Sequence, residues 1–174
     1  MPRTRTKKSK KTATFTRVRR SRYINCQQHV ASCGPIAVAN LIKWHGIETS
    51  YRAVLKFCQA LEFYIPALGM FPPEMARLLR ALKVKFKLRR RFKIKDMDAV
   101  LDRGCCIILI YAAHPPYELH CVFVDRRENG SYRAWNTLRK SSPWVSRKDM
   151  VRSLRRSRPN RLFAHIVQPL KKQK

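Results

Sequence analysis

The stretch "CQQHVASCGPIAVANLIKWHG", residues 26–46, places a cysteine at the start of a predicted helix. Residues 34–45 are apolar on nearly every side, which is typical of a central, buried helix, and Gly46 is expected to end it. Cys33 stands directly before this helix. Because the positive end of a helix dipole favours a thiolate over a thiol, we expect a lowered pKa for Cys33 and predict a nucleophilic cysteine.

Composition and charge narrow the classes of function. The 174 residues include 39 Lys or Arg against 10 acidic residues, a formal net charge of +29, and 45% of them are hydrophobic. The length fits one domain with a core of its own. The charge favours a polyanionic partner, DNA or RNA first and an anionic membrane surface second. A ribonucleoprotein or the core of a virion would suit such a protein.

The sequence contains no evident export or membrane segment. The longest apolar run, residues 105–113, is too short to span a bilayer, and the N-terminus is charged and lacks the apolar core of a signal peptide. Six cysteines without an export signal predict free thiols in a reducing compartment. We therefore expect the cytoplasm or the interior of a virion.

Three regions are predicted: a disordered basic arm at 1–22, a folded domain at 23–168 and a basic tail at 169–174. The arm is expected to contact the phosphate backbone of nucleic acid without reading its bases. Its cations are Arg3, Arg5, Lys7, Lys8, Lys10, Lys11, Arg17, Arg19, Arg20 and Arg22.

Within the domain, helical signals come first and strand signals later. Further helices are predicted at 50–60, 72–82, 95–104 and 146–156, and strands at 83–91, 105–111, 118–126, 131–137 and 161–168. This order predicts an α+β fold in which N-terminal helices pack on an antiparallel sheet.

A nucleophilic cysteine needs a base, a group that orients the base, and donors for an oxyanion. His120 lies inside a predicted strand and is the best candidate for the base; Asn136, on the next strand, is the best candidate to orient it. Gln27 is placed to supply an oxyanion donor beside the Cys33 N–H. For Asn136 to share the face of His120, we predict a three-residue hairpin loop, residues 128–130, in place of a two-residue turn.

These residues resemble a known family. The pattern Q-x5-C-G-P-x-A at 27–37, the segment "GMFPPEMARLLRAL", the step "LDRGCCIILIY" and the pair "HCVFVD" and "YRAWN" are similar, in that order, to the C39 and C39-like papain-fold cysteine peptidases. The resemblance covers about residues 24–140 and implies Cys33 as nucleophile, His120 as base, Asn136 as orienting residue and Gln27 as oxyanion residue. Many C39-type members carry Asp where this chain has Asn136.

Several interpretations remain open. The first is a cysteine peptidase held on nucleic acid by its arms, similar to a maturation protease packaged in a virion. The second is a catalytically inactive C39-like structural protein that binds DNA or RNA. Acyl transfer of the transglutaminase type shares the same nucleophile chemistry. Cys26, His29 and Cys33 are spaced like metal ligands but lack a fourth partner, so neither a metal nor another cofactor is predicted.

Overall fold

The computed structural model describes residues 23–25, 31–66, 68–114, 118–136, 142–157 and 162–169. The basic arm at 1–22, the candidate oxyanion residue Gln27 and the tail from residue 170 onward lie outside these ranges. The described part contains helices α1 (Cys33–Trp44), α2 (Tyr51–Ala60), α3 (Pro72–Ala81), α4 (Ile94–Asp102) and α5 (Arg147–Arg156). Its strands are β1 (Phe86–Arg89), β2 (Cys106–His114), β3 (Glu118–Glu128), β4 (Ser131–Trp135), β5 (Trp144–Ser146) and β6 (Phe163–Val167).

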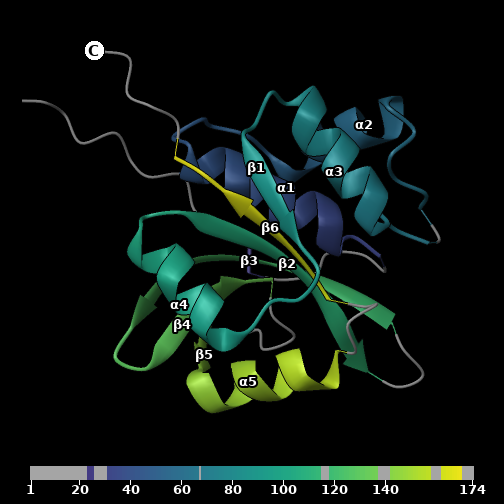
Figure 1. The fold of residues 1–174 in the computed structure, drawn as a ribbon. Coiled ribbons are helices and arrows are strands. Elements are labelled where there is room, and N and C mark those ends of the chain that lie inside the picture. Colours follow the sequence, from purple (N-terminus) through teal and green to yellow (C-terminus); the bar gives the residue numbers. More distant parts are fainter. Residues whose placement is uncertain are drawn as a thin grey trace, which may run out of the picture.

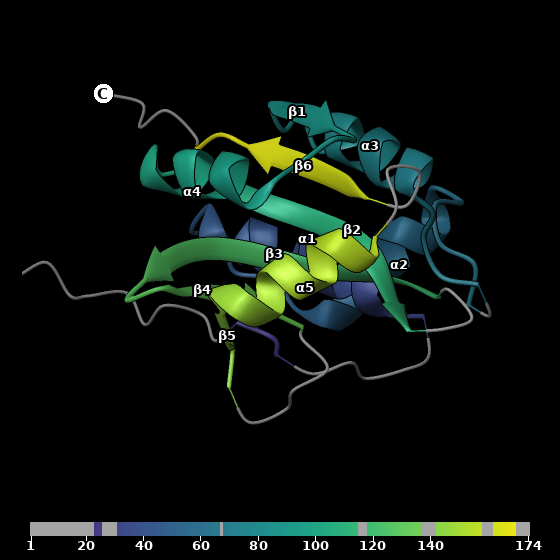
Figure 2. The same ribbon diagram turned by 60° about the horizontal axis from the view of Figure 1, so that its bottom comes forward.

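The six strands form one antiparallel sheet in the order β1-β6-β2-β3-β4-β5. Helices α1, α2 and α3 lie on one side of this sheet, and α4 and α5 lie on the other (Figures 1 and 2). Each side has its own buried core, because alternate residues of a strand point to opposite faces. The predicted α+β fold with helices packed on an antiparallel sheet is confirmed.

Helix α1 is the central element of the first layer. Its residues from Gly34 to Leu41 are all buried, as the apolar sequence predicts. Asn40 is the polar exception, and its side chain is matched on both sides: its Oδ1 accepts from the N–H of Ile24 at 2.8 Å and its Nδ2 donates to the Ile24 carbonyl at 2.8 Å. The segment that leads toward the start of α1 is therefore fastened to the middle of the same helix.

Local signals set the ends of the other helices. The Ser50 side chain accepts a hydrogen bond from Ala53 N–H and caps α2, and Pro72 occupies the first turn of α3. Gly104, with φ of +70°, follows the end of α4. The predicted helix bounds agree with the observed ones to within about two residues. None of the described helices is long and apolar enough to cross a membrane.

The hairpin between β3 and β4 differs from the prediction. Asn129 and Gly130 form a two-residue turn with φ of +47° and +70°, and Glu128 pairs directly with Ser131, so the predicted three-residue loop is wrong. The extra residue lies instead in β3, where the register shifts by one between Val124 and Arg126. A bulge at Asp125 thus restores the register that the loop was expected to give.

Side-chain contacts hold this bulge in place. The carboxylate of Asp125 is 1% exposed and forms a bidentate ion pair with the guanidinium of Arg133, while the indole Nε1 of Trp135 donates to it at 3.2 Å. Both partners lie on β4, so one carboxylate clamps the neighbouring strand against the irregular part of β3. The consequence is that Trp135 pairs with Phe123 and residue 136 comes beside Val122.

Candidate active site

The candidate site lies where β4 separates from β3. Strand β4 ends at Trp135, and Asn136 then turns away with φ of +67°. Cys121, further back on β3, is therefore not paired with β4 within the described residues. Its main chain is instead contacted by the start of α1 and by the Asn136 side chain, which brings three segments of the chain together at one point.

Cys33 is the first residue of α1 and is partly buried. Burial is the largest influence on its thiol and raises the pKa of Cys33 above the ordinary value. Hydrogen bonds from the backbone at Cys121 and Gly34 act in the opposite direction, as N–H donors to a sulfur do. The expectation of a lowered pKa for Cys33 is therefore wrong for this arrangement, because desolvation outweighs the favourable position at the helix start.

His120 is 5% exposed and sits two residues before Val122 on β3. Its Nε2 lies 2.6 Å from the main-chain carbonyl oxygen of Asn136. A carbonyl can only accept a hydrogen bond, so Nε2 carries the proton and Nδ1 carries the lone pair in the neutral ring. The ring of Tyr111, opposite His120 on β2, packs edge-on against it with the centroids 5.8 Å apart. These two contacts fix the tautomer and the orientation of the imidazole.

The Asn136 side chain has a different partner from the one we expected. Its Nδ2 donates to the carbonyl of Cys121 at 3.1 Å and lies 3.5 Å from the carbonyl of Cys33, whereas the main-chain carbonyl is the group that meets His120. Its Oδ1 is buried and makes no hydrogen bond within the described residues. Asn136 thus links β3, the start of α1 and the imidazole at once.

The backbone is strained just before Cys33. Ala31 has φ of +66°, an unusual value for a residue with a side chain. The loop before α3 packs directly on it: a Cβ placed on Gly69 would lie 2.9 Å from the Ala31 carbonyl oxygen. Asn136, across the site, also has positive φ. Backbone strain of this kind gathers at functional sites and persists only where the surroundings enforce it.

Asn136 thus contacts both His120 and the main chain of Cys33, while Gln27 lies outside the described residues. Two contributors were missed. Cys121 acts through its main chain and gave no signal in the sequence beyond its place next to His120. Tyr111 could have been found by pairing the strand at 105–111 with that at 118–126, which sets it opposite the histidine.

Comparisons with known proteins agree with this geometry at the level of the fold. No family model matches the chain, and no curated protein matches it by sequence. Among solved structures, the peptidase domain of Streptococcus ComA, a bifunctional ABC transporter involved in quorum sensing, superposes with a TM-score of 0.55. That match has 12% identity and covers 85% of this chain and 99% of that domain.

A Bacillus anthracis protein described as a C39-like peptidase superposes with a TM-score of 0.56 at 13% identity. This match covers 88% of this chain and 96% of that one. Two superpositions that span most of every chain establish an α+β papain-like fold of the C39-like class. At such low identity the likeness concerns the fold alone.

Proposed function

We propose that this protein is a papain-like cysteine hydrolase, a peptidase, in which Cys33 is the nucleophile and His120 the general base. The observation that carries the proposal is the junction at Asn136: its carbonyl lies 2.6 Å from His120 Nε2 and its amide lies 3.5 Å from the Cys33 carbonyl. This leaves Nδ1 as the basic nitrogen of the ring. Asn136 is the orienting residue, and Gln27 and the Cys33 N–H are the oxyanion donors.

The reaction balances with these groups alone. His120 takes the proton of the Cys33 thiol, and the sulfur attacks the peptide carbonyl carbon to form an S–C bond. His120 then gives the proton to the leaving amine as the C–N bond breaks. Water attacks the thioester, its proton passes to His120 and then to the sulfur, and the S–C bond breaks to release a carboxylic acid and the free thiol. The burial that raises the pKa of Cys33 makes the first proton transfer the demanding step.

The basic arm gives the proposed enzyme its location. Ten cations in residues 1–22 suit non-specific contact with DNA or RNA phosphates, so the peptidase would act on proteins assembled around nucleic acid. A maturation protease enclosed with a genome in a virion fits this combination. The tether predicts that activity on a nucleic-acid-bound substrate falls steeply with salt.

Alkylation by iodoacetamide between pH 5 and 9, read by mass spectrometry, tests the nucleophile. Cys105 is half-buried like Cys33 and serves as an internal reference in the same digest. Because burial raises the pKa of Cys33, its alkylation at neutral pH depends on His120 taking the thiol proton, so we expect His120→Ala to slow Cys33 and to leave Cys105 unchanged. In a second measurement, we expect Cys33→Ser to lose peptide hydrolysis. A Cys33 alkylation rate unchanged in His120→Ala would contradict the proposal.

One observation favours a second function, an inactive C39-like structural protein that binds nucleic acid. Burial raises the pKa of Cys33, and a thiol held protonated is a poor nucleophile. Under this alternative, the wild type hydrolyses no peptide, and Cys33→Ser leaves the salt dependence of its binding to nucleic acid unchanged.

A further inference from the structure

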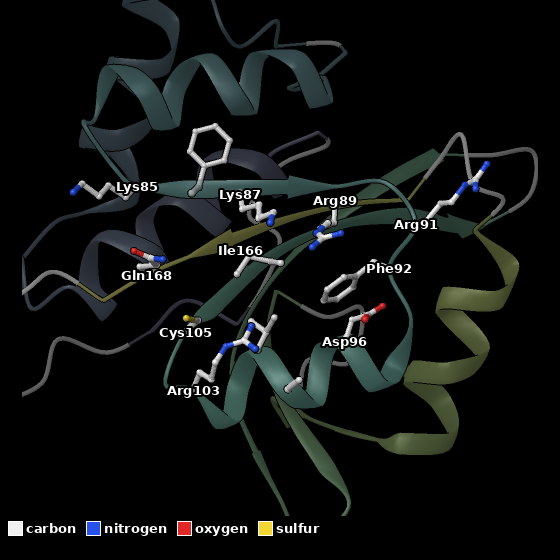
Figure 3. Close-up of a pocket in the computed structure, with 13 residues that line it drawn as sticks. Lys85, Lys87, Arg89, Arg91, Phe92, Asp96, Arg103, Cys105, Ile166 and Gln168 are labelled. Carbon is white, nitrogen blue, oxygen red and sulfur yellow. The ribbon is translucent and has the colours of Figure 1, made fainter.

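A groove on the folded domain gathers positive charge on the face of the sheet away from Cys33. It lies between the edge strand β1 and helix α4, has a volume of about 400 Å³, and is shown in Figure 3. Its floor is apolar, formed in part by Phe92, Val100 and Ile166. Because Lys87 pairs with Ile166, and Ile166 packs in the core beneath α4, the groove opens on the face of the sheet opposite α1.

The groove is lined by five cations and one acid. The cations are Lys85, Lys87, Arg89, Arg91 and Arg103, all of them exposed. The acid is Asp96, whose carboxylate already accepts the backbone N–H of Lys93 at 2.8 Å and caps α4. Among the described residues, the ion pairs join Glu74, Asp98, Asp102, Asp125 and Asp149 to other arginines, and none involves these five cations. With a single carboxylate among five cations, the groove keeps an excess of positive charge.

Most of the cations lie along one side of the groove, and Arg103 faces them from the other side. Lys87 and Arg89 are alternate residues of β1, so they lie on one face of the strand about 6.6 Å apart, and Lys85 directly precedes the strand. Arg103, at the end of α4, stands across the groove from this row (Figure 3). Lysines on an edge strand also discourage aggregation, but that role does not require a cation on the facing helix. Cations along one side of a groove and opposite it suit a linear chain of negative charges better than a single anion.

We propose that this groove binds the sugar–phosphate backbone of single-stranded nucleic acid. The inference takes its ligand class from the proposed nucleic-acid tether but places a second, structured contact on the domain itself, independent of residues 1–22. Cations on two sides of a groove of about 400 Å³ suit the phosphates of one strand, and the apolar floor suits its unpaired bases. The apolar floor has no base-reading pattern, so binding is non-specific in sequence.

The test compares two full-length variants of equal charge. The groove variant is Lys87→Gln with Arg89→Gln and Arg103→Gln; the control is Arg52→Gln with Lys56→Gln and Arg77→Gln, exposed cations of α2 and α3 on the other side of the sheet. Binding of a fluorescent 20-nucleotide oligothymidylate is measured from 50 to 300 mM salt. Each phosphate contact on a single strand contributes about 0.7 to the slope of log K against log salt, so we expect the groove variant to lose about 2 from that slope. We expect the control variant to keep the slope.

Three binding results would overturn the inference. The first is an unchanged slope in the groove variant, and the second is equal weakening of binding in both variants. The third is displacement of the strand by polyglutamate at equal charge concentration, which would indicate an acidic protein ligand. Photocrosslinking of 4-thiothymidine strands to the unmodified protein gives a second measurement that does not depend on variant folding. Crosslinks to peptides containing residues 85–103 are expected, and crosslinks confined to residues 1–22 would also overturn the inference. Alkylation of Cys33 is expected to be unchanged in the same variants. The test of nucleic-acid binding in the groove can therefore fail without affecting the test of the peptidase proposal.

Discussion

Acid should destabilise this fold through one buried histidine. His165 lies in the middle of β6, opposite Leu88 on one side and Ile108 on the other, and it is 0% exposed. Burial lowers its pKa from 6.5 to about 4, although a backbone hydrogen bond at Ile108 acts in the opposite direction. Between these two pH values the unfolded chain binds a proton that the folded protein rejects. Stability therefore falls as the pH drops from about 7 to about 4, and this residue adds no further loss below that.

The size of the effect follows from the two pKa values. A gap of 6.5 to about 4, at about 1.4 kcal/mol for each pH unit, gives a loss of about 3 kcal/mol. Urea unfolding followed by tryptophan fluorescence at pH 7, 5.5 and 4 measures it, and His165→Leu provides the comparison. Carboxylates with lowered pKa, such as Asp98, also weaken the fold in acid, but they do so equally in both proteins. We expect the wild type to lose about 3 kcal/mol more than His165→Leu between pH 7 and 4. The same loss in both proteins would refute the reasoning.

Three further perturbations test the site and its supports. Asp125→Ala leaves the Arg133 guanidinium without its buried partner and should lower the free energy of unfolding in urea by about 3 kcal/mol. Adding Arg133→Ala to that variant should lower it little further, and additive losses would contradict a coupled pair. Asn136→Gly keeps the positive φ but removes the buried amide, so it should slow Cys33 alkylation and cost about 1–3 kcal/mol because the Cys121 carbonyl loses its donor. Asn136→Ala should add about 1 kcal/mol of backbone strain to that loss, and identical melting of the two variants would argue against the strain. Gly69→Ala should lower the melting temperature, since its Cβ would lie 2.9 Å from a carbonyl oxygen and its φ is +84°; an unchanged melt would show that the loop shifts freely.

Much of the fold follows from short-range signals. Serine caps, a proline in a first turn and glycines after helix ends act within a few residues, so the helix bounds were predicted closely. Strand β5 was missed because three residues, 144–146, carry no measurable period. The raised pKa of Cys33 was also missed. Its cause is packing against β3, which residues 26–46 cannot reveal.

The hairpin shows how Asn136 comes beside Val122 although the predicted three-residue loop is wrong. For Asn136 to lie on the same face of the sheet as His120, the hairpin needs one residue more than a regular two-residue turn provides. In the sequence, Gly130 in the turn is the natural position for that extra residue. The chain uses Asp125 instead, because its carboxylate finds Arg133 and Trp135 on the next strand, contacts that only the folded sheet brings together. Either device would set residue 136 beside Val122. The register is therefore the constrained quantity, and the same clamp that stabilises the sheet also delivers the Asn136 carbonyl to the imidazole.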